Sequence, residues 1–120
     1  MGEKERKVTE VQKTIKGFPG APGVSEGPAR LIVSHEDLPT LKTGDILVCP
    51  HTSPAWTPIF SKIKGVVTDS GGVLKDASIT AREYGIPAVV GTSVATTSIK
   101  NGDIIRVNGN EGLVEILSKK

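Results

Sequence analysis

The chain has little of what many small proteins use to stay folded. Its single cysteine, Cys49, excludes an internal disulfide and fits a reducing compartment such as the cytoplasm. Aromatic residues make up only 3% of the sequence, so valine, isoleucine, leucine and alanine must supply most of the core. No apolar run is long enough to cross a bilayer, and the first residues lack the apolar region of a signal peptide. These absences indicate a cytoplasmic protein that folds as one domain.

Neither sign of charge dominates the chain. There are 15 basic and 13 acidic residues, which leaves a formal net charge of +2. This balance gives no indication of a nucleic acid or a membrane as a partner. Much of the basic excess lies in residues 1–16 and in the final two lysines. We expect residues 1–16 to be a charged tail or linker, in which residues 8–15 could form a helical turn, and residues 17–120 to be the folded domain.

Glycine and proline punctuate the chain often, at 14 and 8 residues, which favours short elements. Thr52-Ser53-Pro54 is a helix start, with a hydroxyl at the N-cap and proline at the first helical position. A second helix is expected from Asp76 to Tyr84, closed by Gly85. Strands are expected at 29–33, 45–49, 65–68, 87–91, 103–107 and 113–117, with a helical turn in 93–98. The pattern predicts an α/β chain with more β than α.

Residues 67–92, VTDSGGVLKDASITAREYGIPAVVGT, are the most informative segment. They predict a strand, a turn at Gly71-Gly72, a short helix beginning at Asp76, and a second strand. Such a turn directs the first amides of the helix toward whatever binds above the glycines, and those amides attract phosphate. The sequence therefore predicts a binding site around this turn.

The same segment resembles the mobile phosphohistidine domain of the phosphoenolpyruvate-utilising enzymes, as in phosphoenolpyruvate synthase, pyruvate phosphate dikinase, rifampicin phosphotransferase and phenylphosphate synthase. The matching residues are Gly71-Gly72, Ala77, Ile79, Ala81-Arg82-Glu83, 85–89 and Gly91, with further matches at 22–27 and 44–48. So many fixed positions in one short window are a specific signal. The resemblance covers residues 17–117 and implies a swivelling β/β/α phosphohistidine domain, a single compact domain with short helices.

In this family a histidine five places after the first glycine carries the phosphoryl group, and here that position is Asp76. The resemblance implies the mobile, phosphoryl-carrier-type subunit of a multi-subunit phosphotransferase that uses phosphoenolpyruvate or ATP. Such a subunit is a component of a dikinase or a phenylphosphate synthase type of kinase, and not a complete enzyme. It would dock on an ATP-grasp-like nucleotide-binding subunit and on a substrate-binding subunit. ATP or phosphoenolpyruvate and Mg²⁺ would be held by those partners, and the domain alone would bind no cofactor.

The residue type at position 76 leaves three interpretations open. A carboxylate can form an acyl phosphate, but that chemistry usually needs a divalent cation held by further carboxylates, and Asp69 is the nearest acid in the sequence. Alternatively, Asp76 only accepts backbone amides in the first turn of its helix. In the third interpretation it replaces the histidine in an inactive domain or mimics its phosphate. The alternative function is then a non-catalytic regulatory or interaction protein that kept the fold.

The remaining candidates have equally plain structural alternatives. His51 could stand in for the missing histidine or be an exposed loop residue. The residues expected to bind phosphate are Gly71, Gly72, Lys75 and Arg82. Arg82 could instead form an internal salt bridge, and Lys75 could simply be solvated. Cys49 and His51 have the spacing of a fragmentary metal site, but two ligands are weak evidence, so we expect no metal and a buried Cys49.

Overall fold

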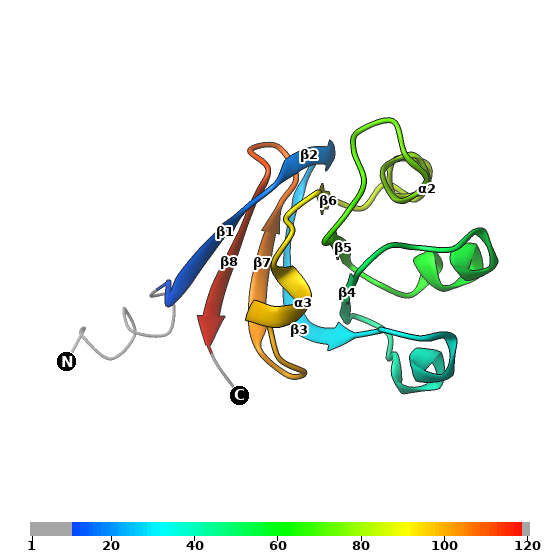
Figure 1. Cartoon of the computed structure of the whole chain (residues 1–120), viewed down its shortest axis with the longest axis horizontal. Helices are drawn as coiled ribbons and strands as arrows, with labels where there is room; N and C mark the ends of the chain where they lie inside the picture. The colour runs from blue at the N-terminus through cyan, green and yellow to red at the C-terminus, as the bar shows by residue number, and fades with distance from the viewer. Residues whose placement is uncertain (1–10, 119–120) are drawn as a thin grey trace.

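Eight short strands form one mixed sheet in the computed structural model, which describes residues 11–118 (Figure 1). The strand order is β1-β8-β7-β3-β4-β5-β6-β2. The strands are β1 (Lys13–Lys16), β2 (Phe18–Ala21), β3 (Val24–Leu31), β4 (Ile46–Cys49), β5 (Gly65–Thr68), β6 (Ala88–Val90), β7 (Ile104–Asn108) and β8 (Leu113–Ser118). The helices are the 3₁₀ helices η1 (His35–Thr40) and η2 (Pro54–Ser61) and the α-helices α2 (Asp76–Tyr84) and α3 (Ala95–Ser98).

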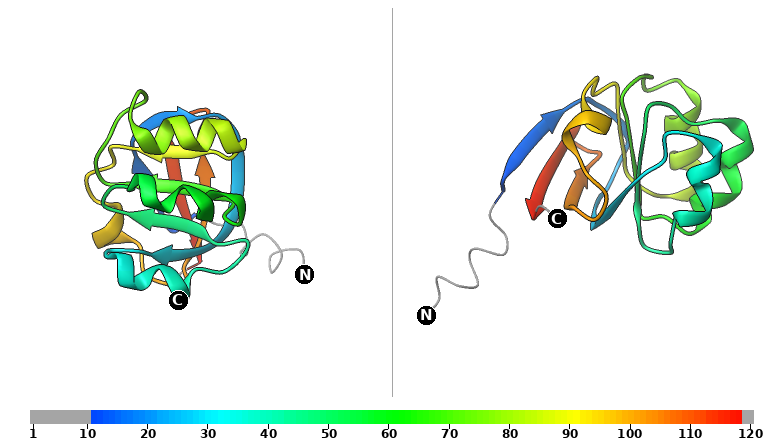
Figure 2. Two further views of the ribbon diagram at one scale, coloured as in Figure 1. Left: turned by 90° about the vertical axis from the view of Figure 1, so that its right-hand side faces the viewer. Right: turned by 60° about the horizontal axis from the view of Figure 1, so that its bottom comes forward.

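The sheet is divided into two layers by β3, which belongs to both. Its first part pairs antiparallel with β7, and its last three residues pair parallel with β4. The strands β1, β8 and β7 complete an antiparallel layer, whereas β4, β5 and β6 are parallel and β2 closes their edge. Figure 2 shows η1, η2 and α2 side by side over the outer face of the parallel layer. This arrangement confirms the predicted β/β/α architecture.

The core consists of two apolar clusters, one on each face of the parallel layer. In β4, Ile46 and Val48 face the antiparallel layer, while Leu47 and Cys49 face the helices. Successive side chains of a strand point to opposite faces, so a strand covered on both sides is apolar throughout. Aliphatic side chains dominate both clusters, as the low aromatic content predicts. No helix among residues 11–118 is long and apolar enough to span a membrane.

Local signals placed the helices well. Ser53 is the N-cap of η2, and its hydroxyl accepts a hydrogen bond from the Ala55 amide at 3.3 Å. Helix α2 has the predicted bounds, and Gly85 ends it in the left-handed conformation with φ of 71°. Caps act through residues next to the helix, which is why the sequence alone reveals them.

The N-terminal part differs from the prediction. Residues 1–10 lie outside the described residues, but Lys13–Lys16 form β1, which pairs with β8, so a helical turn up to residue 15 is wrong. The sheet therefore includes residues that precede Gly17, where the folded domain was expected to begin. Strand β2 was also missed, because Pro19 and Gly20 are typical strand breakers. It lies at the edge of the sheet, where proline is tolerated.

Candidate functional site

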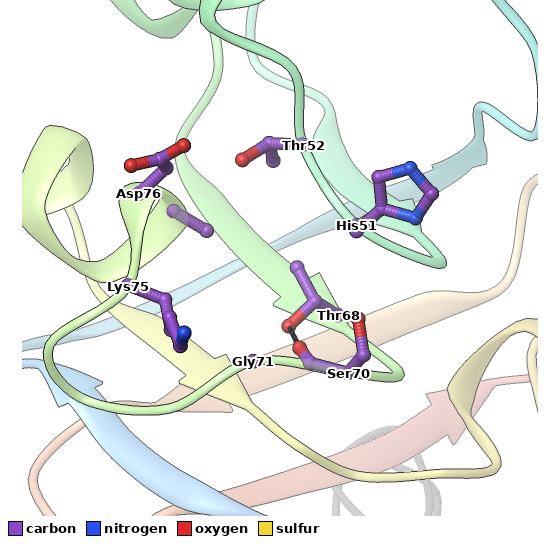
Figure 3. Close-up of a pocket in the computed structure, with 8 residues that line it drawn as sticks. His51, Thr52, Thr68, Ser70, Gly71, Lys75 and Asp76 are labelled. Carbon is purple, nitrogen blue, oxygen red and sulfur yellow. Dashed lines mark hydrogen bonds between the residues drawn. The ribbon is translucent and has the colours of Figure 1, made fainter.

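A cavity of about 410 Å³ lies where β4 and β5 end and α2 begins (Figure 3). Its walls are His51, Thr52, Thr68, Ser70, Gly71, Lys75, Asp76 and Ala77. Four predicted site residues thus come together from three segments: Asp76, Lys75, Gly71 and His51. Gly72 and Arg82 are not part of this lining. The carboxyl end of parallel strands is the usual place for a ligand site in a sheet of this kind.

Asp76 is the first residue of α2 and is exposed at the wall of the cavity. Its N-cap, Lys75, makes no side-chain capping bond, and no hydrogen bond to the Asp76 carboxylate is found within residues 11–118. Asp76 thus lies in the first turn of its helix, as one of the three interpretations expects. The hydrogen bonds from backbone amides that this interpretation also expects are not found among these residues. In Figure 3 the Thr52 side chain is directed toward Asp76, whereas the His51 ring points away from it. His51 and Asp76 share the cavity but are not aimed at one point.

The second acid, Asp69, is engaged elsewhere. Its carboxylate accepts hydrogen bonds from the Thr96 amide at 3.0 Å and from the Thr96 hydroxyl at 2.5 Å. It does not line the cavity, so it gives Asp76 no second carboxylate there. Among the described residues, no group of three or more histidine, cysteine, aspartate or glutamate side chains is placed to hold a metal ion.

The turn at Gly71 forms the floor of the cavity. Gly71 has φ of 104°, a left-handed conformation that favours glycine. The hydroxyl of Thr68 donates to the Ser70 carbonyl at 2.5 Å, and the hydroxyl of Ser70 donates to the Pro50 carbonyl at 2.9 Å. These two hydroxyls therefore fix the turn between β5 and α2. The place of Thr52 and of the two turn hydroxyls in the site was missed from the sequence, where Thr52 was recognised only as part of a helix start.

Two side chains of α2 hold the loop that leads into the helix. Ser78 is fully buried, and its hydroxyl donates to the Gly72 carbonyl at 2.9 Å. The Arg82 guanidinium donates to the Val73 carbonyl at 2.9 Å and to the carbonyl of Gly20. Within residues 11–118 Arg82 forms no salt bridge, and it does not line the Asp76 cavity, so its hydrogen bonds hold the helix and the loop together. Because arginine carries several donors in a planar fork, one side chain can join strand, loop and helix.

Cys49 is a core residue, as predicted. Burial, and to a smaller extent the negative charge of Asp69, raises the pKa of its thiol from 9.0 to about 12. The thiol is therefore protonated at neutral pH, and a buried protonated thiol is inert. His51, by contrast, is exposed.

A family model and similar protein sequences place this chain among known proteins. The family model "PEP-utilising enzyme, mobile domain" matches residues 41–112. The chain is 51% identical over 105 residues to a rifampicin phosphotransferase of Bacillus cereus, which covers 88% of this chain and 12% of that protein. It is 40% identical over 111 residues to a phosphoenolpyruvate synthase of Aeropyrum pernix, and this match covers 92% of this chain and 14% of that protein. The chain thus spans only about an eighth of the length of these two relatives.

Solved structures agree on the fold. An NMR structure of Enzyme I matches with a TM-score of 0.57 and 33% identity, covering 63% of this chain and 32% of that chain. The aconitase X of Thermococcus kodakaraensis matches with a TM-score of 0.64, over 87% of this chain and 98% of that chain. At 20% identity this likeness concerns the fold alone. The family model and the relatives above 30% identity confirm the family that the Gly71-Gly72 motif predicts. The chain belongs to the mobile domain family of the phosphoenolpyruvate-utilising enzymes.

Proposed function

We propose that this chain is the mobile, phosphoryl-carrier-type component of a phosphotransferase that uses phosphoenolpyruvate or ATP. It presents the Asp76 cavity first to an ATP-grasp-like nucleotide-binding partner and then to a substrate-binding partner. The observation that carries this proposal is the position of Asp76, exposed in an open cavity at the start of α2, where the family has its carrier residue. The relatives have most of their length outside the matching stretch, which supports partner domains.

The chemistry at Asp76 would be a transfer of one phosphoryl group. A carboxylate oxygen forms a bond to phosphorus while the bond to the leaving nucleotide or enolate breaks, and the product is an acyl phosphate. The first amides of α2 have no partner within the helix and favour negative charge there. Lys75 adds a positive charge at the cavity wall. An acceptor on the second partner then attacks the phosphorus and restores the carboxylate.

A second candidate function is favoured by the surroundings of Asp76. No carboxylate accompanies it in the cavity, because Asp69 is bound by Thr96. Its own negative charge also repels an incoming phosphate that the helix would otherwise attract. In this second candidate the domain docks on the same partners but carries nothing, and acts as a regulatory or interaction protein.

Label transfer separates these candidates. The chain is incubated with Mg²⁺, ATP labelled at its β and γ phosphates, and the full-length rifampicin phosphotransferase of B. cereus, and the small chain is then resolved by gel electrophoresis. A carrier becomes labelled in a form that hydroxylamine removes, and Asp76→Asn abolishes the label. Under the second candidate the native chain stays unlabelled, whereas Asp76→His acquires an acid-labile label. If neither the native chain nor Asp76→His is labelled, both candidates are refuted.

A further inference from the structure

Three large apolar side chains close to Asp76 in the chain are exposed instead of lying in the core. Leu74 is 80% exposed, and Val73 and Ile79 are about 40% exposed, at 41% and 42%. Val73 and Leu74 belong to the loop that leads into α2, and Ile79 lies three residues after Asp76, on the same side of the helix. We call these three residues the Leu74 surface. Figure 1 shows the loop between β5 and α2 projecting beyond the strands.

An exposed phenylalanine extends this surface on the β2 side. Phe18 is 57% exposed, in a chain with few aromatic residues. A Cβ atom added to Gly91 would lie 2.8 Å from the Phe18 ring and 2.9 Å from the Gly71 carbonyl oxygen. The ring therefore lies beside the turn that forms the cavity floor. Single exposed apolar residues are common, but a group of them around a functional cavity is typical of a protein interface.

The backbone beneath the Leu74 surface is fixed by hydrogen bonds. The Gly72 carbonyl accepts from the Ser78 hydroxyl at 2.9 Å and from the Lys75 amide at 3.1 Å. The next carbonyl, that of Val73, accepts from Arg82 at 2.9 Å. Leu74 thus extends from a loop that is bound on both sides. A side chain presented in this way loses less conformational entropy on association than one on a mobile loop.

The position of this surface indicates what covers it. Leu74 directly precedes Lys75 and Asp76, which line the cavity, so a protein that delivers a phosphoryl group to position 76 comes close to Leu74. Lys75, the next residue, is exposed and lines the cavity, and its positive charge complements the phosphates of a bound nucleotide.

We propose that the Leu74 surface is the docking site for the nucleotide-binding partner, with Leu74 as the residue that anchors the contact. This proposal rests on the proposed function, because it concerns the same cavity. Leu74 fills an apolar hollow of the partner while the nucleotide phosphates face Lys75 and position 76. The contact sets the affinity of docking and takes no part in the chemical step.

The test uses the Asp76→His chain, in which we expect a phosphorylated histidine to report docking. The probe is the full-length rifampicin phosphotransferase of B. cereus with labelled ATP and Mg²⁺, and the concentration of chain that gives half-maximal labelling rate is measured. Adding Leu74→Ser should raise this concentration at least about tenfold, since burying a leucine is worth more than the 1.4 kcal/mol that a factor of ten requires. The labelling rate at saturation should remain unchanged.

Val24→Ser is the matched control. Val24 is also an exposed aliphatic residue, at 51%, but it pairs with Asn108 in the antiparallel layer. It should leave the half-saturating concentration unchanged, and both variants should unfold at the temperature of the parent chain. Equal half-saturating concentrations for Leu74→Ser and Val24→Ser would overturn the docking proposal while leaving the proposed function intact.

Two further outcomes are distinguishable. If Leu74→Ser is labelled normally but passes its label to rifampicin more slowly, the surface serves the substrate-binding partner and our assignment is wrong. If neither the native chain nor the Asp76→His chain with Leu74 intact is labelled, the proposed function itself fails, and the docking proposal falls with it.

Discussion

Replacing Gly20 by alanine should loosen the loop that carries the Asp76 cavity. A Cβ atom at Gly20 would lie 3.3 Å from both Ser78 Cβ and Val90 Cγ1, and closer still to the Ser78 hydroxyl. Ser78 must then rotate and give up its hydrogen bond to the Gly72 carbonyl. Overpacking costs about 1–3 kcal/mol and the lost hydrogen bond about 0.5–1.5 kcal/mol, so the free energy of unfolding should fall by about 2–4 kcal/mol.

A double-mutant cycle in urea isolates the contact. Ser78→Ala alone should cost about 0.5–1.5 kcal/mol, because the Gly72 carbonyl still accepts from the Lys75 amide. In that background Gly20→Ala has no hydrogen bond left to break, so the two costs should fall short of additivity by about 1 kcal/mol. If the slope of the unfolding free energy against urea concentration is the same for all variants, the midpoint urea concentrations give these free-energy differences directly.

Gly72→Ala provides the control for this cycle. A Cβ atom at Gly72 would meet nothing within 4 Å, and its backbone is not in the left-handed region. Alanine there should therefore be neutral or stabilise the fold by up to about 1 kcal/mol, because it lowers the conformational entropy of the unfolded chain. Our reasoning about the Gly20–Ser78 contact is refuted if Gly20→Ala costs no more than Gly72→Ala, or if its cost adds fully to that of Ser78→Ala.

Three other outcomes are expected. Arg82→Leu removes the bonds to the Gly20 and Val73 carbonyls and should lower the free energy of unfolding by about 1–3 kcal/mol in urea, which an unchanged midpoint would contradict. Because burial raises the Cys49 pKa from 9.0 to about 12, its contribution to stability is complete below pH 9 and is lost as pH rises toward 12. Cys49→Ala should flatten stability between pH 9 and 11, and the native thiol should react with a thiol reagent only after unfolding. Ser93 has φ of 69°, so Ser93→Gly should raise the thermal midpoint through a gain of about 0.5 kcal/mol, and a lower midpoint would count against strain there.

The sequence predicts the elements that depend on neighbouring residues. The bounds of α2 follow from Gly85 at its end, and η2 follows from Ser53 and Pro54 at its start. The β4 strand follows from an unbroken apolar run between turns. By contrast, β1 and β2 are short edge strands whose only support is a distant partner strand, so their residues contain no sufficient local pattern.

The candidate site was predicted in position but not in its internal contacts. The cavity contains Asp76, Lys75 and Gly71, which are close together in the sequence. His51 lies with them because the parallel strands β4 and β5 end at the same edge of the sheet. The engagement of Asp69 by Thr96 depends on residues 27 apart in the chain. No sequence pattern indicates which acid is bound in this way.

The sequence by itself determined the family, the Gly71-Gly72 turn and the helix that follows it, because turn, cap and periodicity are encoded over a few residues. It also determined that position 76 carries a carboxylate where a histidine is expected. Only the tertiary structure decided that Arg82 holds the loop instead of facing the cavity, since its acceptor at Gly20 is 62 residues away. It also decided that Leu74 is exposed, on a loop whose two preceding carbonyls, those of Gly72 and Val73, accept hydrogen bonds from α2.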